Sequence, residues 1–167
     1  MTSSCKIAQL LGKLENGSEF EAYEAAKCLS GLKGAKVLTE LIRILRLGKQ
    51  PYARQAAAYA LSWQKNRRAV DSLLACAANP GERDSVKGQA LEGLTIHLER
   101  ASARSSLRLK AEKLIFCALR SSSPTLRFWA CFGLGTLGCE RAIPRLHKIA
   151  VADTELCPGW WYVREDR

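Results

Sequence analysis

The stretch YARQAAAYALSWQKNRRAVDSLLACA, residues 52–77, holds the pattern that decides the fold of this chain. Apolar residues recur in it with the spacing of α-helices, and the polar residues 64–66 divide it in two. Ala57 lies four positions before Leu61, inside a run of alanines. Alanine is the best helix former, and its small side chain allows another helix to approach closely. The stretch therefore predicts two helices, of which the first packs closely against its neighbours.

The same pattern occurs in three other segments, residues 21–45, 85–98 and 126–150. Each has an alanine four positions before a leucine, and the four leucines are 32, 33 and 40 residues apart. The pairs are Ala25 and Leu29, Ala57 and Leu61, Ala90 and Leu94, and Ala130 and Leu134. The third copy carries an extra stretch, ERASARSSLR (99–108), which predicts about two more helical turns or a longer loop.

These repeats predict a single all-α domain, because one helical hairpin cannot bury its apolar stripe alone and stacked copies can. We divide the chain into a leading helix (1–17), four repeats (18–49, 50–80, 81–122 and 123–152) and a C-terminal tail (153–167).

Two copies carry the fullest version of a motif, Arg-x-x-Ala-x-x-x-Leu followed by Arg-Ala-(Val/Ile)-x-x-Leu. Its positions are Arg54, Ala57, Leu61, Arg68, Ala69, Val70 and Leu73 in the second copy, and Arg127, Ala130, Leu134, Arg141, Ala142, Ile143 and Leu146 in the fourth. The motif resembles the HEAT repeat, in the short form found in phycobilisome-lyase-like proteins and in small bacterial HEAT-repeat proteins. The resemblance covers residues 20–150. It implies a right-handed α-solenoid of about four hairpins, whose second helices line the concave surface.

The charge of the chain favours an anionic partner, because its net charge is +10 and its pI is about 9.5. Basic residues follow the predicted second helices, which the resemblance places on the concave face. The predicted partner-binding residues are Arg43, Arg46, Arg108, Lys113, Arg145 and Lys148. Two further basic rows, at equivalent positions of the copies, are expected to hold the repeats together. They are Arg54, Lys87 and Arg127, and Lys36, Arg68 and Arg141.

The C-terminal stretch LCPGWWYVREDR, residues 156–167, follows the last repeat. A solenoid's last repeat has no successor to cover its apolar side, so a cap is expected there. Trp160, Trp161 and Tyr162 carry much apolar area in few residues. We interpret these three aromatic residues as this cap, with contact to a partner as the alternative.

Motifs of known chemistry do not occur in the sequence. It has two histidines outside any metal-binding spacing, seven scattered cysteines and no phosphate-binding glycine loop. We therefore expect no catalytic residues, no cofactor and no metal. The first residues lack the apolar core of a signal peptide, and no stretch has the about 20 apolar residues of a membrane span. A cytoplasmic protein with reduced cysteines and no membrane contact is the expectation.

Three functions remain open from the sequence. The first is a non-enzymatic scaffold or adaptor that binds an acidic protein through the basic concave face, a role that includes toxin-neutralising immunity proteins. The second is nucleic-acid binding through the same face, as in DNA-alkylation-repeat proteins, which the resemblance suggests. The third is the handling of a small molecule, as in phycobilin lyases.

Overall fold

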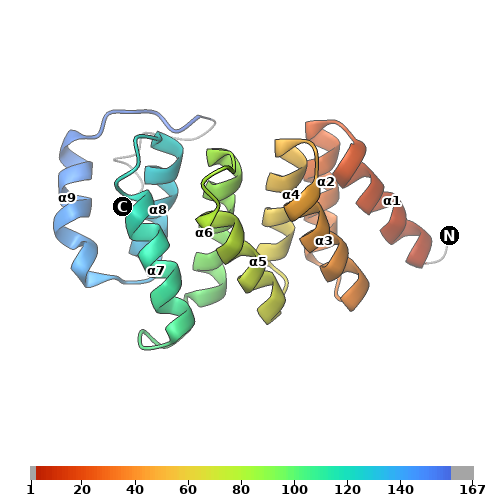
Figure 1. Cartoon of the computed structure of the whole chain (residues 1–167), viewed down its shortest axis with the longest axis horizontal. Helices are drawn as coiled ribbons and strands as arrows, with labels where there is room; N and C mark the ends of the chain where they lie inside the picture. Colours follow the sequence, from red (N-terminus) through yellow and green to blue (C-terminus); the bar gives the residue numbers. More distant parts are fainter. Residues whose placement is uncertain (1–2, 159–167) are drawn as a thin grey trace.

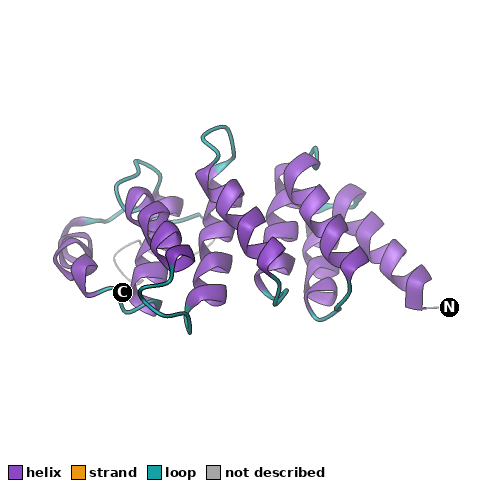
Figure 2. Cartoon of the chain, turned by 60° about the horizontal axis from the view of Figure 1, so that its bottom comes forward, coloured by secondary structure: helices purple, strands orange, loops and turns teal. Residues whose placement is uncertain are grey.

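The computed structural model describes residues 3–158 of the chain. This part consists of α-helices and one short 3₁₀ helix joined by loops (Figures 1 and 2). The helices are α1 (Ser3–Asn16), α2 (Glu19–Ser30), α3 (Ala35–Leu47), α4 (Pro51–Ser62), α5 (Arg67–Ala78), α6 (Asp84–Leu98), α7 (Ser106–Ala118), α8 (Pro124–Thr136), η1 (Glu140–Ala142) and α9 (Ile143–Ala152).

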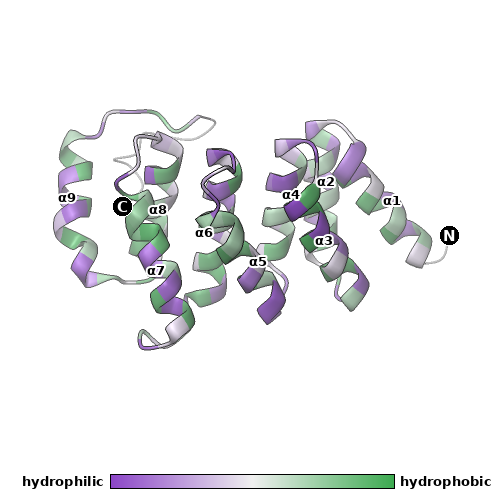
Figure 3. Ribbon diagram, viewed as in Figure 1, coloured by the Kyte–Doolittle hydropathy of each residue, from purple (hydrophilic) through white to green (hydrophobic). Residues whose placement is uncertain are grey.

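The helices form two rows, and this arrangement confirms the predicted all-α solenoid. Helices α2, α4, α6 and α8 lie side by side in one row, which we call the inner row. Helices α3, α5, α7 and α9 form the outer row, with α1 at its start (Figure 1). Figure 3 shows hydrophilic and hydrophobic residues alternating around the outer helices, as expected for helices with one buried stripe.

The inner row is packed closely because small residues face each other across it. The leucines that mark the repeats are fully buried there. A Cβ added at Gly133 of α8 would lie 2.8 Å from the Thr95 Oγ1 of α6. A Cβ added at Gly93 of α6 would clash with the Ser62 side chain of α4. Neighbouring inner helices therefore approach each other more closely than larger side chains would allow.

The inner row is the concave side of the stack. Each inner helix packs extensively against the next one, whereas neighbouring outer helices contact each other much less. A stack in which one row is more closely spaced curves toward that row. The expectation that the second helices line the concave face is therefore wrong, and the first helices line it.

Side chains from one repeat close the helix ends of the repeat before it. Gln64 Nε2 donates hydrogen bonds to the carbonyl oxygens of Leu29 (3.2 Å) and Leu32 (2.9 Å) at the end of α2. At the equivalent position of the next copy, His97 Nε2 lies 3.0 Å from the carbonyl oxygen of Leu61. Burial lowers the pKa of His97, so the neutral ring donates this bond. These bonds satisfy carbonyl groups that a helix leaves free at its C-terminus.

In one of the two basic rows, that of Arg54, Lys87 and Arg127, the two arginines hold neighbouring segments together as predicted. Arg54 binds the Gly48 carbonyl oxygen (2.8 Å) and forms an ion pair with Glu82 (2.7 Å). Arg127 repeats the arrangement in the last copy, with the Ser121 carbonyl oxygen (2.9 Å) and Asp153 (2.6 Å). Each arginine ties the start of its helix to the loop before it and to a carboxylate more than 25 residues later.

The extra stretch of the third copy is a longer loop, since α6 ends at Leu98 and α7 begins at Ser106. Arg108 fastens this loop: it donates to the Ala101 carbonyl oxygen (2.9 Å) and to the Leu137 carbonyl oxygen after α8. It also pairs with Glu112 at 3.0 Å. Arg108 is consequently buried inside the protein, at 8% exposure.

Candidate functional site

A groove lined by aromatic side chains opens on the inner row. Phe20 and Tyr23 of α2 are 74% and 46% exposed, although most of the other apolar residues of this row are buried. Together with Tyr52 of α4 they border a groove of about 530 Å³. Gln55 of α4 and Gln89 of α6 extend its lining across three consecutive repeats. The groove is large enough to receive several side chains of a bound molecule.

Local hydrogen bonds fix the N-terminal end of this groove. Ser18 caps α2 by accepting from the Glu21 backbone N–H, and the Ser18 backbone N–H donates to the Glu21 carboxylate at 3.0 Å. This reciprocal pair sets the first turn of α2, which carries Phe20. Tyr52 Oη donates to the Gly17 carbonyl oxygen (3.0 Å) and joins the start of α4 to the same corner.

A second aromatic pair continues the groove along the inner row. The rings of Tyr23 and Tyr59 lie 5.4 Å apart, between centroids, and join α2 to α4. Lys27 Nζ sits 5.4 Å from the centroid of the Tyr23 ring and also pairs with Glu24 at 2.5 Å. A lysine over a tyrosine face shows that this surface accommodates a positive charge.

The positions two residues before the repeat leucines form a line across the inner row. From α2 to α8 they are Lys27, Tyr59, Glu92 and Phe132. Burial raises the pKa of Tyr59, and the charges of Tyr23 and Glu92 raise it further. Burial also raises the pKa of Glu92, while a hydrogen bond from Gln89 opposes this shift. Within this line, the partly buried carboxyl group of Glu92 therefore stands between two aromatic residues, Tyr59 and Phe132.

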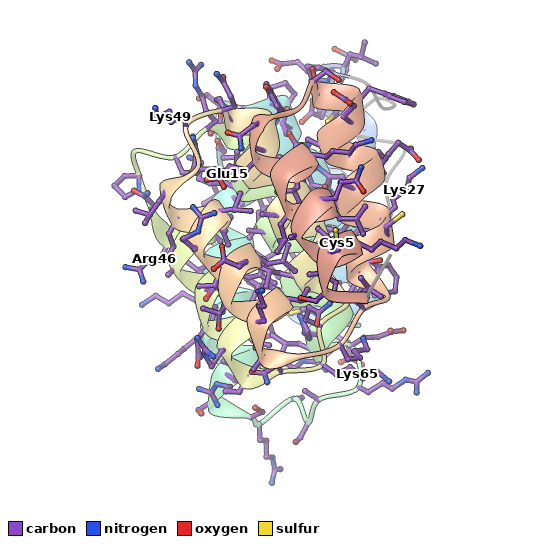
Figure 4. The ribbon with its side chains drawn as sticks, turned by 90° about the vertical axis from the view of Figure 1, so that its right-hand side faces the viewer. Cys5, Glu15, Lys27, Arg46, Lys49 and Lys65 are labelled. Atoms are coloured by element: carbon purple, nitrogen blue, oxygen red, sulfur yellow. The ribbon has the colours of Figure 1, made fainter. Side chains whose placement is uncertain are left out.

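The two rows differ in charge. The outer helices α3, α5, α7 and α9 carry mainly basic residues, whereas the inner helices carry similar numbers of both signs. The outer charges are Lys36, Arg43, Arg46, Arg67, Arg68, Arg108, Lys110, Lys113, Arg145 and Lys148 against Glu40, Asp71 and Glu112. The inner ones are Lys27, Arg54, Lys87 and Arg127 against Glu19, Glu21, Glu24, Asp84 and Glu92. Figure 4 shows Lys27 of α2 on the side opposite to Arg46.

Two of the predicted partner-binding residues serve the fold. Arg43 pairs with Glu15 of α1 (2.6 Å) and with Glu40 of its own helix (2.9 Å), so its charge is neutralised locally. Arg108 is buried and bonded as described above. The prediction that Arg108 faces a partner is therefore corrected, because its guanidinium group holds the loop after α6.

The other four predicted residues are exposed on the outer row but do not form one patch. Arg46 lies near the end of α3, and Lys113 borders a hollow at the middle of α7. Only Arg145 and Lys148 of α9 come together, in a hollow of about 490 Å³ that Arg120 also lines. Arg145 and Lys148 are therefore the pair of predicted residues that lines one hollow, and a role of the four exposed residues in binding a partner stays a prediction.

The aromatic residues predicted as a cap or a partner contact belong to the C-terminal end of the sequence. Trp160, Trp161 and Tyr162 lie outside the described residues. Trp129 of α8 is buried, at 7% exposure. Trp63, at the end of α4, is 46% exposed.

Among residues 3–158 no group of His, Cys, Asp and Glu side chains is arranged to hold a metal ion. None of the helices in this part has the length and apolar character needed to cross a membrane.

Family models of repeat proteins match most of the chain. A model of HEAT repeats matches residues 7–95, more than half of the 167 residues. A model of the PBS lyase HEAT-like repeat matches residues 126–151. The chain therefore belongs to the HEAT-repeat family. No curated protein sequence matches it.

Solved structures with the same fold include two enzymes. One is a chain of the complex of CpcE and CpcF of phycocyanin lyase from Nostoc sp. PCC7120, with a TM-score of 0.72 and 20% identity. The similarity covers 92% of this chain and 93% of that one. The other is human deoxyhypusine hydroxylase in complex with glycerol, with a TM-score of 0.58 and 20% identity. It covers 80% of this chain, which spans 44% of the hydroxylase.

These two structures overturn the expectation that the chain is not an enzyme. Both similar proteins are named as enzymes, so an all-α solenoid without familiar catalytic motifs is no ground for excluding activity. At 20% identity the likeness concerns the fold, and the groove on the inner row must be judged from its own residues.

The aromatic residues of the inner row were not among the site residues predicted from the sequence. A signal for them was present: Phe20, Tyr23, Tyr52 and Tyr59 are aromatic residues within five positions of the repeat alanines of the first two copies. The distribution of basic residues along the sequence indicates the second helices instead.

Proposed function

We propose that this chain binds a protein partner along the inner groove, which is lined by Phe20, Tyr23, Tyr52 and neighbouring residues. The observation that carries the proposal is the exposure of Phe20 and Tyr23 on a row of helices that otherwise buries nearly all its apolar area. Exposed aromatic side chains around a hollow are typical of the anchoring centre of protein interfaces.

The geometry of the groove suits an extended or helical segment with apolar side chains. The lining comes from α2, α4 and α6, so a segment lying across the inner row contacts three repeats at once. Tyrosine also offers a hydroxyl group for hydrogen bonds at low entropic cost, since its side chain has few rotatable bonds.

The similar solved structures add support from the level of the fold. The structure from Nostoc is a complex of two proteins, and this chain matches one of its chains nearly end to end. An assembly with another protein is therefore compatible with a solenoid of this size. A role in handling a small molecule, as in a phycocyanin lyase, rests on this likeness in fold alone.

The proposal is tested by affinity capture from native cells with four versions of the full chain. Phe20→Ala with Tyr23→Ala removes the groove aromatics, and Leu47→Ala is the matched control, because Leu47 is 71% exposed on the outer helix α3. Arg145→Glu with Lys148→Glu reverses the outer basic charges. We expect a partner that wild type and Leu47→Ala retain equally and that the groove variant loses by about tenfold or more.

A second candidate uses the basic end of the outer row. Arg120, Arg145 and Lys148 line one hollow together with Asp153 and Glu155, which pair with Arg127. The remaining basic charge of the hollow favours an acidic protein surface or a nucleic acid. In the same capture experiment, this second function predicts that only the charge-reversal variant loses its partner. A nucleic acid would also be released steeply as salt rises, because phosphate contacts depend on counterion release. That pattern of results would contradict binding in the inner groove.

A further inference from the structure

Glu92 is an exception among the shielded carboxylates of this protein. The carboxyl side chains of Glu82, Glu112 and Asp153 are 8%, 7% and 11% exposed, and each is paired with at least one arginine. Glu15, at 27% exposure, pairs with Arg43. These pairs follow the rule that a charge removed from water needs a partner of opposite charge.

Glu92 lacks such a partner within the described chain. Its side chain is partly buried on the inner face of α6. The Gln89 amide donates a hydrogen bond to one carboxylate oxygen. No Lys, Arg or His of residues 3–158 lies within ion-pair distance of it, although the protein as a whole has an excess of ten positive charges. Among the carboxylates of residues 3–158, Glu92 is thus the shielded one that has no cationic partner, although the chain is rich in basic residues.

The surroundings of Glu92 suit a cation from outside. Tyr59 and Phe132 occupy the positions equivalent to Glu92 on α4 and α8, the two inner helices that pack against α6. The faces of aromatic rings attract cations, and a carboxylate adds a charged hydrogen-bond acceptor. Lys27 over Tyr23 is an example of this contact on the same row.

We propose that the Glu92 carboxylate, next to Tyr59 and held by Gln89, binds a cationic side chain of the protein partner, a lysine or an arginine. Gln89 also lines the inner groove, so a residue of the groove is hydrogen-bonded to the proposed cation site. This inference rests on the proposed function and specifies the chemistry of the partner: an apolar segment followed by a basic residue. The outer basic row plays no part in it.

The test is a titration of the full ¹⁵N-labelled chain with n-butylguanidinium chloride at constant ionic strength. The neutral compound n-butylurea, which has nearly the same shape, serves as the reference ligand. We expect saturable shifts of the Gln89 side-chain amide and the Glu92 backbone amide with the cation, and at least about tenfold weaker binding of the urea. Equal binding of the two compounds, or no saturable shift with the cation, would overturn the proposal.

Two variants locate the site. Glu92→Gln keeps the size of the side chain and removes its charge, and we expect it to weaken binding of the cation by about tenfold. Glu24→Gln is the control on the same row, because Glu24 is already paired with Lys27. It should leave the affinity unchanged, and an equal loss in both variants would contradict a specific site. The titration uses no partner, so its failure is distinguishable from failure of the capture experiment with Phe20 and Tyr23.

Discussion

The position of a basic residue in the sequence of this protein does not show whether its side chain is buried or exposed. Arg108 and Arg145 both occur among the basic residues of predicted second helices, yet Arg108 is buried and Arg145 is exposed. The difference arises from the Leu137 carbonyl oxygen, which Arg108 binds across 29 residues of sequence. A contact between residues so far apart in the sequence leaves no local sequence pattern. The sequence therefore predicts that residue 108 is charged, but not that its side chain is buried.

Glu92 makes the stability of the protein depend on pH. Burial raises its pKa in the folded state above the ordinary value of 4.5, so the folded protein holds this proton more tightly than the unfolded chain does. The Glu92 contribution therefore lowers stability as pH rises from 4.5 through the raised folded value. Tyr59, its titratable neighbour on α4, keeps its proton throughout because burial raises its pKa as well.

We predict that Glu92→Gln removes this part of the pH dependence. The free energy of unfolding of the variant should exceed that of wild type by a margin that grows as pH rises from the ordinary value of 4.5 through the raised folded pKa. Urea unfolding followed by circular dichroism at several pH values measures the margin. A constant difference over this range would show that Glu92 titrates as an ordinary surface carboxylate.

At the scale of helices, the close approach within the inner row depends on glycine. The Gly93 backbone of α6 lies against Ser62 of α4, and Leu73 Cδ1 would be 3.0 Å from an added Cβ. Serine at position 62 in turn bonds back to the Ala58 carbonyl oxygen at 2.9 Å, which holds its side chain in place.

Gly93→Ala should accordingly push α4 and α6 apart and destabilise the protein by about 1–3 kcal/mol. Gly12→Ala is the matched control: Gly12 lies inside α1, and an added Cβ meets nothing within 4 Å. There alanine should stabilise the helix by about 0.5–1 kcal/mol. Urea unfolding midpoints compare the two, and equal effects of both substitutions would refute the close contact.

The helices and their repeats could be predicted because helical periodicity is a local property of sequence. The four leucines and their alanines mark four inner helices, and all four leucines are buried as expected. Which row lines the concave side could not be predicted in this way. Curvature follows from the spacing between helices, which is set by contacts such as Gly93 with Ser62 in different copies.

At the scale of the whole molecule, the inner and outer rows of helices give the protein two faces of different chemistry. The inner face has an aromatic groove and one shielded carboxylate without a cationic partner in the described chain, and the outer face has most of the excess positive charge. The candidate site was therefore predicted only in part. We still propose that the concave side binds a partner, but through aromatic side chains and not through basic ones.

The most direct test of the central claim is site-specific photo-crosslinking in native cells. A photoreactive phenylalanine derivative replaces Phe20 in one version of the chain and Leu47 in another, two positions with nearly equal exposure, 74% and 71%, on opposite rows. Binding in the inner groove predicts a discrete crosslinked protein from position 20 and none from position 47. A crosslink from position 47 alone, or from neither position, would contradict it.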